Sequence, residues 1–525
     1  MAYYLVQGGS TLKIMTTSGG LTSLTLPTDV VLDTAKRLRG ATLGNTTVIV
    51  GSPTRNLSID RYRNVRLLVP DPPASKVTLG TAASGSLSGT FNVKVTFIVK
   101  DEFGNLIAES NFGPVSANQA VSSQYLTVSA IPLSSQVISA RRLYRTTTGP
   151  GTVYYPWLDV DGNTVTTAQD DVSDAGLATV AGPTDLGAPP KFEIIAAWKD
   201  RLWGKSEDKI DTLYYSAVGK IYAWPSTNTI PIPPTNRDTT GITGFLPRKD
   251  ILGVGRRDSI SRISSSGNNV FTRVTEAEGI GIWATDSCIV AHDVGYFLGN
   301  PFGIYRWTQK VENISNPKVK DWFESDTYFN RARFDQAIGM YDPKLNAYIV
   351  LLSAAGSTDL DRWIMYDIAE NTWWGPHLTS AFTPTFCATL RDANDVAIAV
   401  FGASDGKLYK PTTTKTDGTA TAIALDVTTN HIHANSPNIL KQWLQPTIRT
   451  KIQASAATLT VTPTVGDTDA SAGSAISHDM TLGNETLRRL GKGEMVKLRL
   501  QNSTNAIDTV IYGVELPFFE LGNRS

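Results

Sequence analysis

The stretch that decides the fold is residues 198–225, which read WKDRLWGKSEDKIDTLYYSAVGKIYAWP. Its short apolar runs are interrupted by Gly, Pro and charged turn residues, and aromatic residues stand near the ends of the runs. Interruption within about ten residues is the spacing of strands rather than of helices. The stretch therefore predicts antiparallel strands joined by tight turns.

The same kind of strand pair returns along the chain. Between residues 191 and 435 it recurs with a loose period of about 40–50 residues, within the range of propeller blades. Each pair can bury its apolar face only against its neighbours, and closure into a ring solves that problem and hides most sheet edges. We therefore predict a mainly β protein built on a β-propeller of about six or seven blades. The pairs lie at residues 198–225, 250–267, 288–309, 336–376 and 396–411.

Pro- and Gly-rich segments at 69–75 and 181–190 separate the propeller strands from another unit. Several short strands in that unit predict an antiparallel sandwich. The expected domains are N-terminal strands that complete the propeller (1–72), a sandwich insert (73–190), propeller blades (191–435) and a small C-terminal β-sandwich (436–525).

Individual strands and helices follow from the same patterns. In the insert, Val93, Val95, Phe97 and Val99 alternate along one strand and predict its buried face. At the end of the chain, the last strand is expected to place Val510, Tyr512 and Val514 on one face. Only short stretches such as 29–40 and 316–326 could form helices.

Composition narrows the class of protein. The chain has 525 residues, with 48 Lys and Arg against 48 Asp and Glu, which argues against nucleic-acid binding through a broad basic surface. Two cysteines cannot form a disulfide framework, so packing must hold the fold. No apolar run reaches the roughly 20 residues of a membrane-spanning helix, and the opening MAYYLVQGGSTLK does not resemble a signal peptide. We expect a soluble, non-secretory protein.

Several motifs match catalytic or metal-binding patterns only in part. Gly402–Gly406 (GASDG) has the form of a serine-hydrolase elbow, but no helix can begin at the following KLYKP, so we interpret it as a turn. DVDGN (159–163) matches the opening of a calcium loop, yet Thr164 and Asp170 stand where that loop needs Gly and Glu. His431 and His433 fall short of the three protein ligands of a catalytic zinc, and we interpret them as surface residues.

The remaining chemical candidates are equally incomplete. Cys288 and Cys387 lie in apolar strands and are expected to be buried packing residues. GVGRRD (253–258) lacks the third glycine and the helix of a phosphate-binding loop. The pairs Asp170/Asp171 and Asp359/Asp361 cannot be told from solvated loop charges without their geometry. We therefore expect no catalytic residue, cofactor site or metal site, and no enzymatic activity.

Tryptophans are abundant in the propeller segment. Because large rings fill the diverging space between blades, we expect most of them to pack blade against blade. The alternative is that some stack on sugars or bases at the propeller mouth. They are Trp198, Trp203, Trp224, Trp283, Trp307, Trp363, Trp373 and Trp374.

Two sets of segments resemble tail proteins of bacteriophages. The order DEFGN, ESNFGP, RRLYRTTTG, YYPWLDV and DDVSDAGL within 76–185 resembles the fibronectin-III-like insert of such proteins. The whole chain resembles the tail nozzle (tail tubular) protein of short-tailed phages, through 198–225, MYD…YDIAENTWW and the final GVELPF. The residues that match its first full blade are Trp198, Arg201, Trp203, Tyr214, Ser216 and Trp224.

This resemblance implies a structural virion protein. Copies would form a ring, usually a homohexamer, that adjoins the portal-adaptor protein, carries tail fibres or tailspikes, and passes double-stranded DNA during genome ejection. The protein would be assembled in the host cytoplasm and reside in the phage tail. Near-zero net charge suits such a conduit, because a strongly basic bore would grip phosphates, and we hypothesise a neutral to acidic bore. The Pro- and Thr-rich segment 228–247 is a candidate gate loop.

Two other functions remain open. One is a virion-attached propeller that binds or cleaves host-surface carbohydrate. The other is a bacterial lectin-like adhesin, which the lack of a recognisable export signal disfavours.

Overall fold

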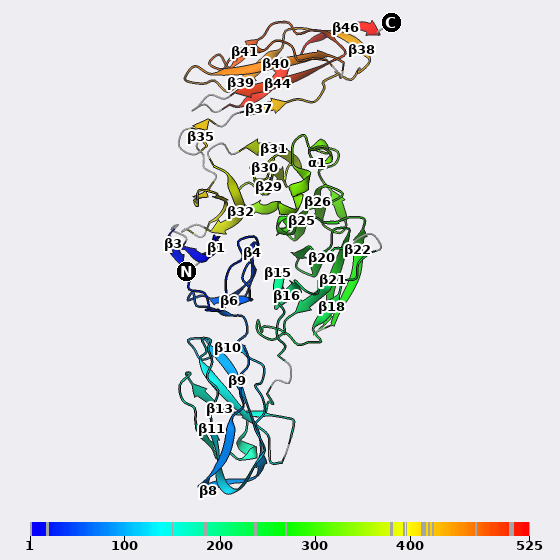
Figure 1. Ribbon diagram of the computed structural model, residues 1–525. Coiled ribbons are helices and arrows are strands. Elements are labelled where there is room, and N and C mark those ends of the chain that lie inside the picture. The colour runs from blue at the N-terminus through cyan, green and yellow to red at the C-terminus, as the bar shows by residue number, and fades with distance from the viewer. Residues whose placement is uncertain are drawn as a thin grey trace. The chain divides into compact units, whose positions relative to one another are not determined.

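The computed structural model describes residues 3–16, 20–149, 151–182, 186–235, 239–267, 270–378, 382–391, 394, 396–410, 416–417, 421–422, 425–467, 470–502 and 509–523. Contacts divide the chain into two compact units. Unit 1 comprises Met1–His377 and Thr385–Gly402, and unit 2 comprises Leu378–Pro384 and Ala403–Ser525. Nearly all regular structure in the described residues is antiparallel β-sheet (Figure 1).

Successive antiparallel sheets form the propeller, as predicted (Figure 1). The first two are β1 (Tyr3–Gly8), β2 (Thr11–Thr16), β3 (Leu21–Ser23), and β4 (Leu38–Leu43), β5 (Thr46–Gly51), β6 (Leu57–Asp60), β7 (Val65–Leu67). The next two are β15 (Phe192–Trp198), β16 (Arg201–Ser206), β17 (Thr212–Tyr215), β18 (Thr229–Pro231), and β19 (Gly244–Pro247), β20 (Ile251–Gly255), β21 (Ser259–Gly267), β22 (Val270–Glu278). The fifth is β23 (Gly281–Ile282), β24 (Ile289–Ala291), β25 (Val294–Asn300), β26 (Gly303–Trp307), β27 (Val311–Asn313). The sixth is β28 (Ile338–Asp342), β29 (Ala347–Leu352), β30 (Arg362–Asp367), β31 (Thr372–Leu378), and the seventh is β32 (Pro384–Arg391), β33 (Ala397–Ala403), β34 (Leu408–Tyr409).

Hydrogen bonds between neighbouring sheets close the ring. Trp198 Nε1 in the third sheet donates to the carbonyl of Arg248 beside the fourth (2.7 Å), and Arg248 Nε donates to the carbonyl of Asp293 in the fifth (2.6 Å). The first and last sheets meet where the Tyr4 hydroxyl donates to the carbonyl of Arg391 (2.7 Å). The N-terminal strand β1 therefore contacts β32 of the last sheet.

The stretch 198–225 owes its pattern to folding of the third sheet. Arg201 Nη1 donates to the carbonyl of Ser216, and the Ser216 hydroxyl accepts from the backbone N–H of Leu202 (3.0 Å). Trp203 is fully buried, and its Nε1 donates to the carbonyl of Trp198 (3.0 Å). These markers of the first full blade thus serve packing and turn geometry.

The insert between β7 and β15 is a sandwich of two sheets, as predicted. One sheet has the order β10 (Leu106–Glu109), β9 (Val93–Lys100), β12 (Ala140–Arg145), β13 (Tyr155–Asp161), and the other β14 (Ala168–Asp170), β11 (Gln119–Ser129), β8 (Thr78–Phe91). Val93 and Val95 belong to the core between these sheets, whereas Val99 packs in a core shared with β5 and β15. One alternating strand therefore serves both the insert and its junction with the propeller.

Unit 2 contains the C-terminal β-sandwich. Its sheets are β37 (Leu425–Thr428), β44 (Met495–Asn502), β40 (Thr458–Gly466), β41 (Ile476–Asp479), then β43 (Gly491–Gly493), β38 (Ile439–Trp443), β46 (Phe518–Asn523), and β42 (Asn484–Thr486), β39 (Thr447–Thr450), β45 (Ile511–Glu515). A short pair, β35 (Thr416–Asp417) and β36 (Thr421–Ala422), also belongs to this unit.

The expectation for the last strand was wrong. The register passes from Arg449↔Gly513 to Thr450↔Ile511, so Tyr512 is an extra residue in a β-bulge. As a result Ile511 and Val514 both pack against the core, and Tyr512 is 70% exposed.

Neither expected helix forms as predicted. Residues 29–40 are turns and a bridge followed by the start of β4, because the apolar positions fill the gap between the first two sheets: Val30 and Leu32 pack with Ile49. In 316–326 only α1 (Asp321–Glu324) is helical. It is followed by the 3-10 helix η3 (Arg331–Gln336).

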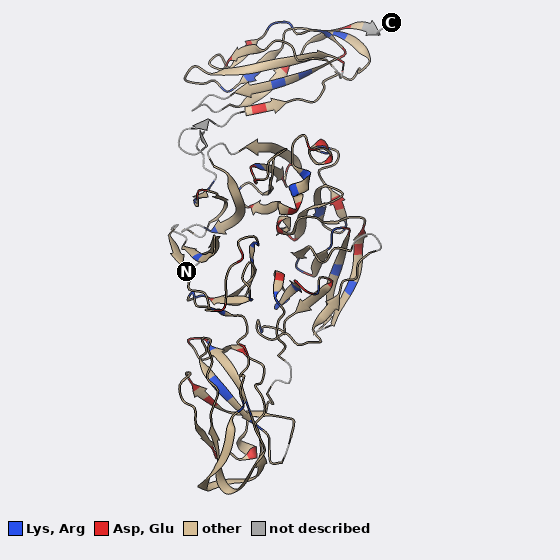
Figure 2. Ribbon diagram, viewed as in Figure 1, with Lys and Arg blue, Asp and Glu red and all other residues tan. Residues whose placement is uncertain are grey.

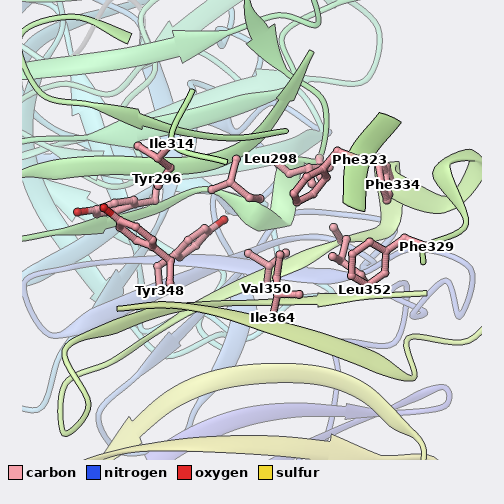
Figure 3. Packing of buried hydrophobic residues seen from close by; sticks show 14 of the residues in the cluster. Tyr296, Leu298, Ile314, Phe323, Phe329, Phe334, Tyr348, Val350, Leu352 and Ile364 are labelled. Atoms are coloured by element: carbon pink, nitrogen blue, oxygen red, sulfur yellow. The ribbon is translucent and has the colours of Figure 1, made fainter. Parts of the chain in front are cut away.

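The largest buried cluster joins the fifth and sixth sheets to this helical excursion. Figure 3 shows Tyr296 and Tyr348 of the strands together at one end of the cluster, and aromatic residues of the excursion near Leu298 and Leu352 at the other. Among the latter, Phe323, Phe329 and Phe334 are at most 1% exposed. The aromatic side chains therefore anchor the excursion in the core, and the polar residues between them lie at the surface.

Candidate functional site

A hollow of about 520 Å³ lies where the fourth and fifth sheets meet the helical excursion. Small-ligand sites combine such a volume with an apolar wall and a few convergent polar groups. The lining residues are Arg257, Trp283, Phe302, Asp326, Asn330, Arg331, Ala332 and Asp335.

Aromatic rings form one wall of the hollow. Trp283 follows β23 and meets Phe302 of the β25–β26 turn edge to face, with ring centroids 4.9 Å apart. Phe302 in turn contacts the buried Phe334 at 5.1 Å. The wall is therefore fixed to the cluster of Figure 3.

Charged side chains supply the polar part of the lining. Asp326 Oδ1 accepts from Arg331 Nε (3.1 Å), and the pKa of Asp326 is lowered mainly by this hydrogen bond. Asp335 Oδ2 accepts from Gln336 Nε2 (2.9 Å). Two carboxylates, Asp326 and Asp335, therefore lie in the lining of the hollow.

An ion-pair cluster spans the middle of the propeller close to this hollow. Asp286 Oδ2 accepts from Arg37 Nη1 (2.9 Å) and Arg39 Nη2 (3.0 Å), and its Oδ1 accepts from Arg39 Nε (2.7 Å). Arg37 Nη2 also donates to the carbonyl of Gln336 (2.7 Å), next to Asp335. Arg39 lies in β4 of the second sheet and Asp286 in the fifth, which are not neighbours in the ring, so the contact crosses its centre. The two guanidinium groups outweigh desolvation and hold the pKa of Asp286 below its usual value.

The serine elbow and the calcium-like loop have structural roles. Residues 402–406 form the turn between β33 and β34, where the N–H of Gly406 donates to the carbonyl of Ala403 (3.0 Å). The prediction of a turn is thus confirmed. In 159–163, the Asp159 carboxylate forms ion pairs with Arg142 and Lys100 (2.7 Å each). Asp159 is therefore part of a salt-bridge network.

The histidine and cysteine predictions hold for most of these side chains. His431 and His433 are exposed, as expected. Cys387 is buried, whereas Cys288 is only partly buried by exposed area. Desolvation nevertheless raises the pKa of both thiols, which keeps them protonated and poor nucleophiles. In the described parts of the chain, no group of three or more His, Cys, Asp or Glu side chains could hold a metal ion.

The carboxylate pairs do not act as pairs. Asp170 is fully buried against Arg145 (2.6 Å), whereas Asp171 accepts from the Ser86 hydroxyl (2.9 Å). Asp361 accepts from the N–H of Ala354 (2.8 Å), and Asp359 bonds Ser357 through its backbone. Asp170 and Asp171 thus bind different partners within the insert, whereas the bonds of Asp359 and Asp361 lie within the loop between β29 and β30.

Within residues 253–258, Gly253 and Gly255 lie in β20 and allow close packing, since a Cβ on Gly253 would overlap the ring of Trp307. The candidate gate segment 228–247 supplies β18 and β19, and its residues 236–238 lie outside the described residues.

Most tryptophans pack within or between sheets, as predicted. Trp198, Trp203, Trp224 and Trp307 are at most 5% exposed. Trp363 and Trp373 are half-buried, and Trp374 is 53% exposed. Among these tryptophans Trp283 lines the hollow, and nothing in the sequence separated it from the others.

Comparison with known proteins gives only distant matches. No family model and no curated protein matches this sequence. Among solved structures, PorZ, a bacterial surface component of the type-IX secretion system of Porphyromonas gingivalis, matches with 12% identity and a TM-score of 0.26, over 99% of this chain and 80% of that chain. An exo-β-1,3-galactanase of Phanerochaete chrysosporium matches with 9% identity and a TM-score of 0.17, over 81% of this chain and 100% of that chain. A protein described as a glycoside hydrolase has 11% identity and a TM-score of 0.17, over 86% and 99% of the two chains.

These matches overturn the expectation of no enzymatic activity, because carbohydrate-active enzymes are among the structures that this chain resembles. We withdraw that expectation. At these TM-scores, no catalytic residue and no substrate is carried over to this chain.

Proposed function

We propose that this chain is a subunit of a bacteriophage tail nozzle, a ring that conducts the genome outward and carries tail fibres. The observation that supports the proposal is the order of modules: a propeller whose first strands are N-terminal, a sandwich inserted between β7 and β15, and a C-terminal sandwich. This is the order that the resemblance of 198–225 and the insert segments to nozzle proteins implies. Partners would be further copies, the portal-adaptor protein and fibre or tailspike proteins.

In this proposal the bore lies between copies. A duplex cannot pass through the middle of one propeller, because Arg37, Arg39 and Asp286 bridge it. Both signs of charge are interspersed along the chain (Figure 2), in keeping with a bore that does not grip phosphates. Within the described residues, no helix is long and apolar enough to cross a lipid bilayer.

Exposed apolar side chains on sheet edges offer surfaces for contacts between copies. Val270 and Val274 of β22 are 56% and 41% exposed, and Phe519 of β46 is 63% exposed. Unpaired edges with apolar side chains are sites where chains associate.

The test is the mass and shape of the purified protein, alone and with the adaptor protein of the same phage. Native mass measurement and negative-stain imaging should find rings of several copies with an axial hole. A protein that stays monomeric in both conditions would contradict the proposal.

A second candidate is a virion-attached propeller that binds or cleaves host-surface carbohydrate. The hollow at Trp283 favours it, because an aromatic wall beside two carboxylates suits a sugar ring and its hydroxyl groups. The comparisons support this candidate better than the first, at the level of fold class. Release of reducing ends from isolated host polysaccharide, lost in Asp335→Asn, would support cleavage, whereas saturable binding without release would support binding alone.

A further inference from the structure

One cation in the hollow is held in place without an acidic partner. The Arg257 guanidinium carbon lies 4.2 Å from the centroid of the Trp283 ring. No hydrogen bond or ion pair joins that guanidinium to any described residue. The other lining cation, Arg331, is already bound to Asp326. Arg257 therefore keeps its N–H donors free for a ligand.

The loop that carries Arg257 is fixed on both sides. The carbonyl of Arg256 accepts from the N–H of Ile282 (2.7 Å), and the carbonyl of Asp258 accepts from the N–H of Gly279 (2.9 Å). The Arg256 side chain is buried, and its Nη1 donates to the carbonyl of Ile232 (3.0 Å). The position of Arg257 thus requires little ordering when a ligand binds.

An arginine stacked on an aromatic ring is suited to planar anions. Its guanidinium presents paired N–H donors that match the two oxygens of a carboxylate. The hollow, about 520 Å³, has the size of a small-ligand site rather than of an extended protein interface. Phe302 and Asp335, in the same lining, add an apolar contact and a hydrogen-bond acceptor for hydroxyl groups.

We infer that the hollow binds a carboxylate-bearing sugar residue, with the carboxylate on Arg257 and the sugar ring beside Trp283 and Phe302. This inference rests on the second candidate function and narrows its ligand to acidic glycans. The alternative partner for such an arginine is an acidic side chain of another protein, which the small volume of the hollow disfavours.

The test uses the full chain and matched pairs of probes: oligosaccharides containing galacturonate, glucuronate or sialate, each with its methyl ester. Calorimetric titration at low and high salt gives the affinities. We expect at least one acidic probe to bind, its ester to bind about tenfold more weakly, and Arg257→Gln to lose about the same factor. Arg262→Gln, on the same sheet but outside the hollow, is the control and should bind as the unmodified protein does.

The possible outcomes separate this inference from the function on which it rests. Equal affinity for acid and ester, or unchanged binding by Arg257→Gln, overturns the carboxylate inference and leaves carbohydrate binding intact. Absence of binding to every probe overturns the carboxylate inference, and a titration with isolated host polysaccharide then shows separately whether the carbohydrate-directed function stands. Unchanged thermal unfolding of Arg257→Gln verifies that a lost affinity is not lost folding.

Discussion

Asp286→Asn tests the ion-pair cluster at the propeller centre most sharply. The substitution removes the charge that faces Arg37 and Arg39 and weakens three charge-assisted hydrogen bonds of 2.7–3.0 Å. Breaking a buried pair costs about 3–5 kcal/mol. Because the three side chains remain 18–29% exposed, solvent reduces this to about 2–3 kcal/mol. Because unit 1 is a large cooperative unit, with an unfolding entropy of about 2 cal/mol/K per residue, that is a fall of roughly 2–4 °C in Tm.

The assay is thermal unfolding at neutral and acidic pH, with Asp250→Asn as the control. Asp250 is 76% exposed in its pair with Lys199, so its replacement should change stability by less than about 0.5 kcal/mol. The folded-state pKa of Asp286 is lowered, so its contribution is full above the unfolded pKa and lost as pH falls through the folded value. The difference between wild type and Asp286→Asn should therefore shrink in acid. Equal Tm values for Asp286→Asn and Asp250→Asn at neutral pH would refute the reasoning.

Three further predictions concern the rest of the molecule. Burial lowers the pKa of His377 to about 4, whereas in the unfolded chain the same group protonates near pH 6.5. The free energy of unfolding should therefore fall progressively from about pH 6.5 down to 4. His377→Gln should flatten that decline when unfolding is measured against pH, and an unchanged slope would contradict the burial of His377. Cys288 and Cys387 should react slowly with a thiol reagent at pH 8 and rapidly in denaturant, since desolvation raises both pKa values; fast native labelling would show that these thiols are accessible. Gly281→Ala should displace the loop that carries Arg257, because the added Cβ would overlap the carbonyl oxygen of Arg256. Although residue 281 does not line the hollow, the affinity for the acidic probe should fall about tenfold. Unchanged affinity would show that Gly281 does not help to position Arg257.

The β-propeller could be predicted because its signal repeats. Each blade must bury an apolar face, so strand pairs with turns return at one spacing, and Trp198 and Trp203 mark one of the sheets in the sequence alone. These features depend on local pattern.

The hollow could not be predicted because its residues are far apart in the sequence. Arg257, Trp283, Phe302 and Asp335 come from three loops and a 3-10 helix, and their meeting depends on how the fifth sheet and the excursion pack. The contact of Arg39 with Asp286 has a sequence separation of 247 residues. The β-bulge at Tyr512 is a local feature, and it could not be predicted because alternation of apolar and polar residues does not reveal one extra residue in a strand.

The measurement that tests the central claim most directly is native mass determination with negative-stain imaging of the purified chain, with and without its adaptor protein. The nozzle proposal predicts closed rings of about six copies with an axial hole, each contact burying at least about 1,000 Å². A chain that stays monomeric in both conditions, yet binds or cleaves host polysaccharide through the hollow, would contradict it and establish the carbohydrate-directed propeller instead.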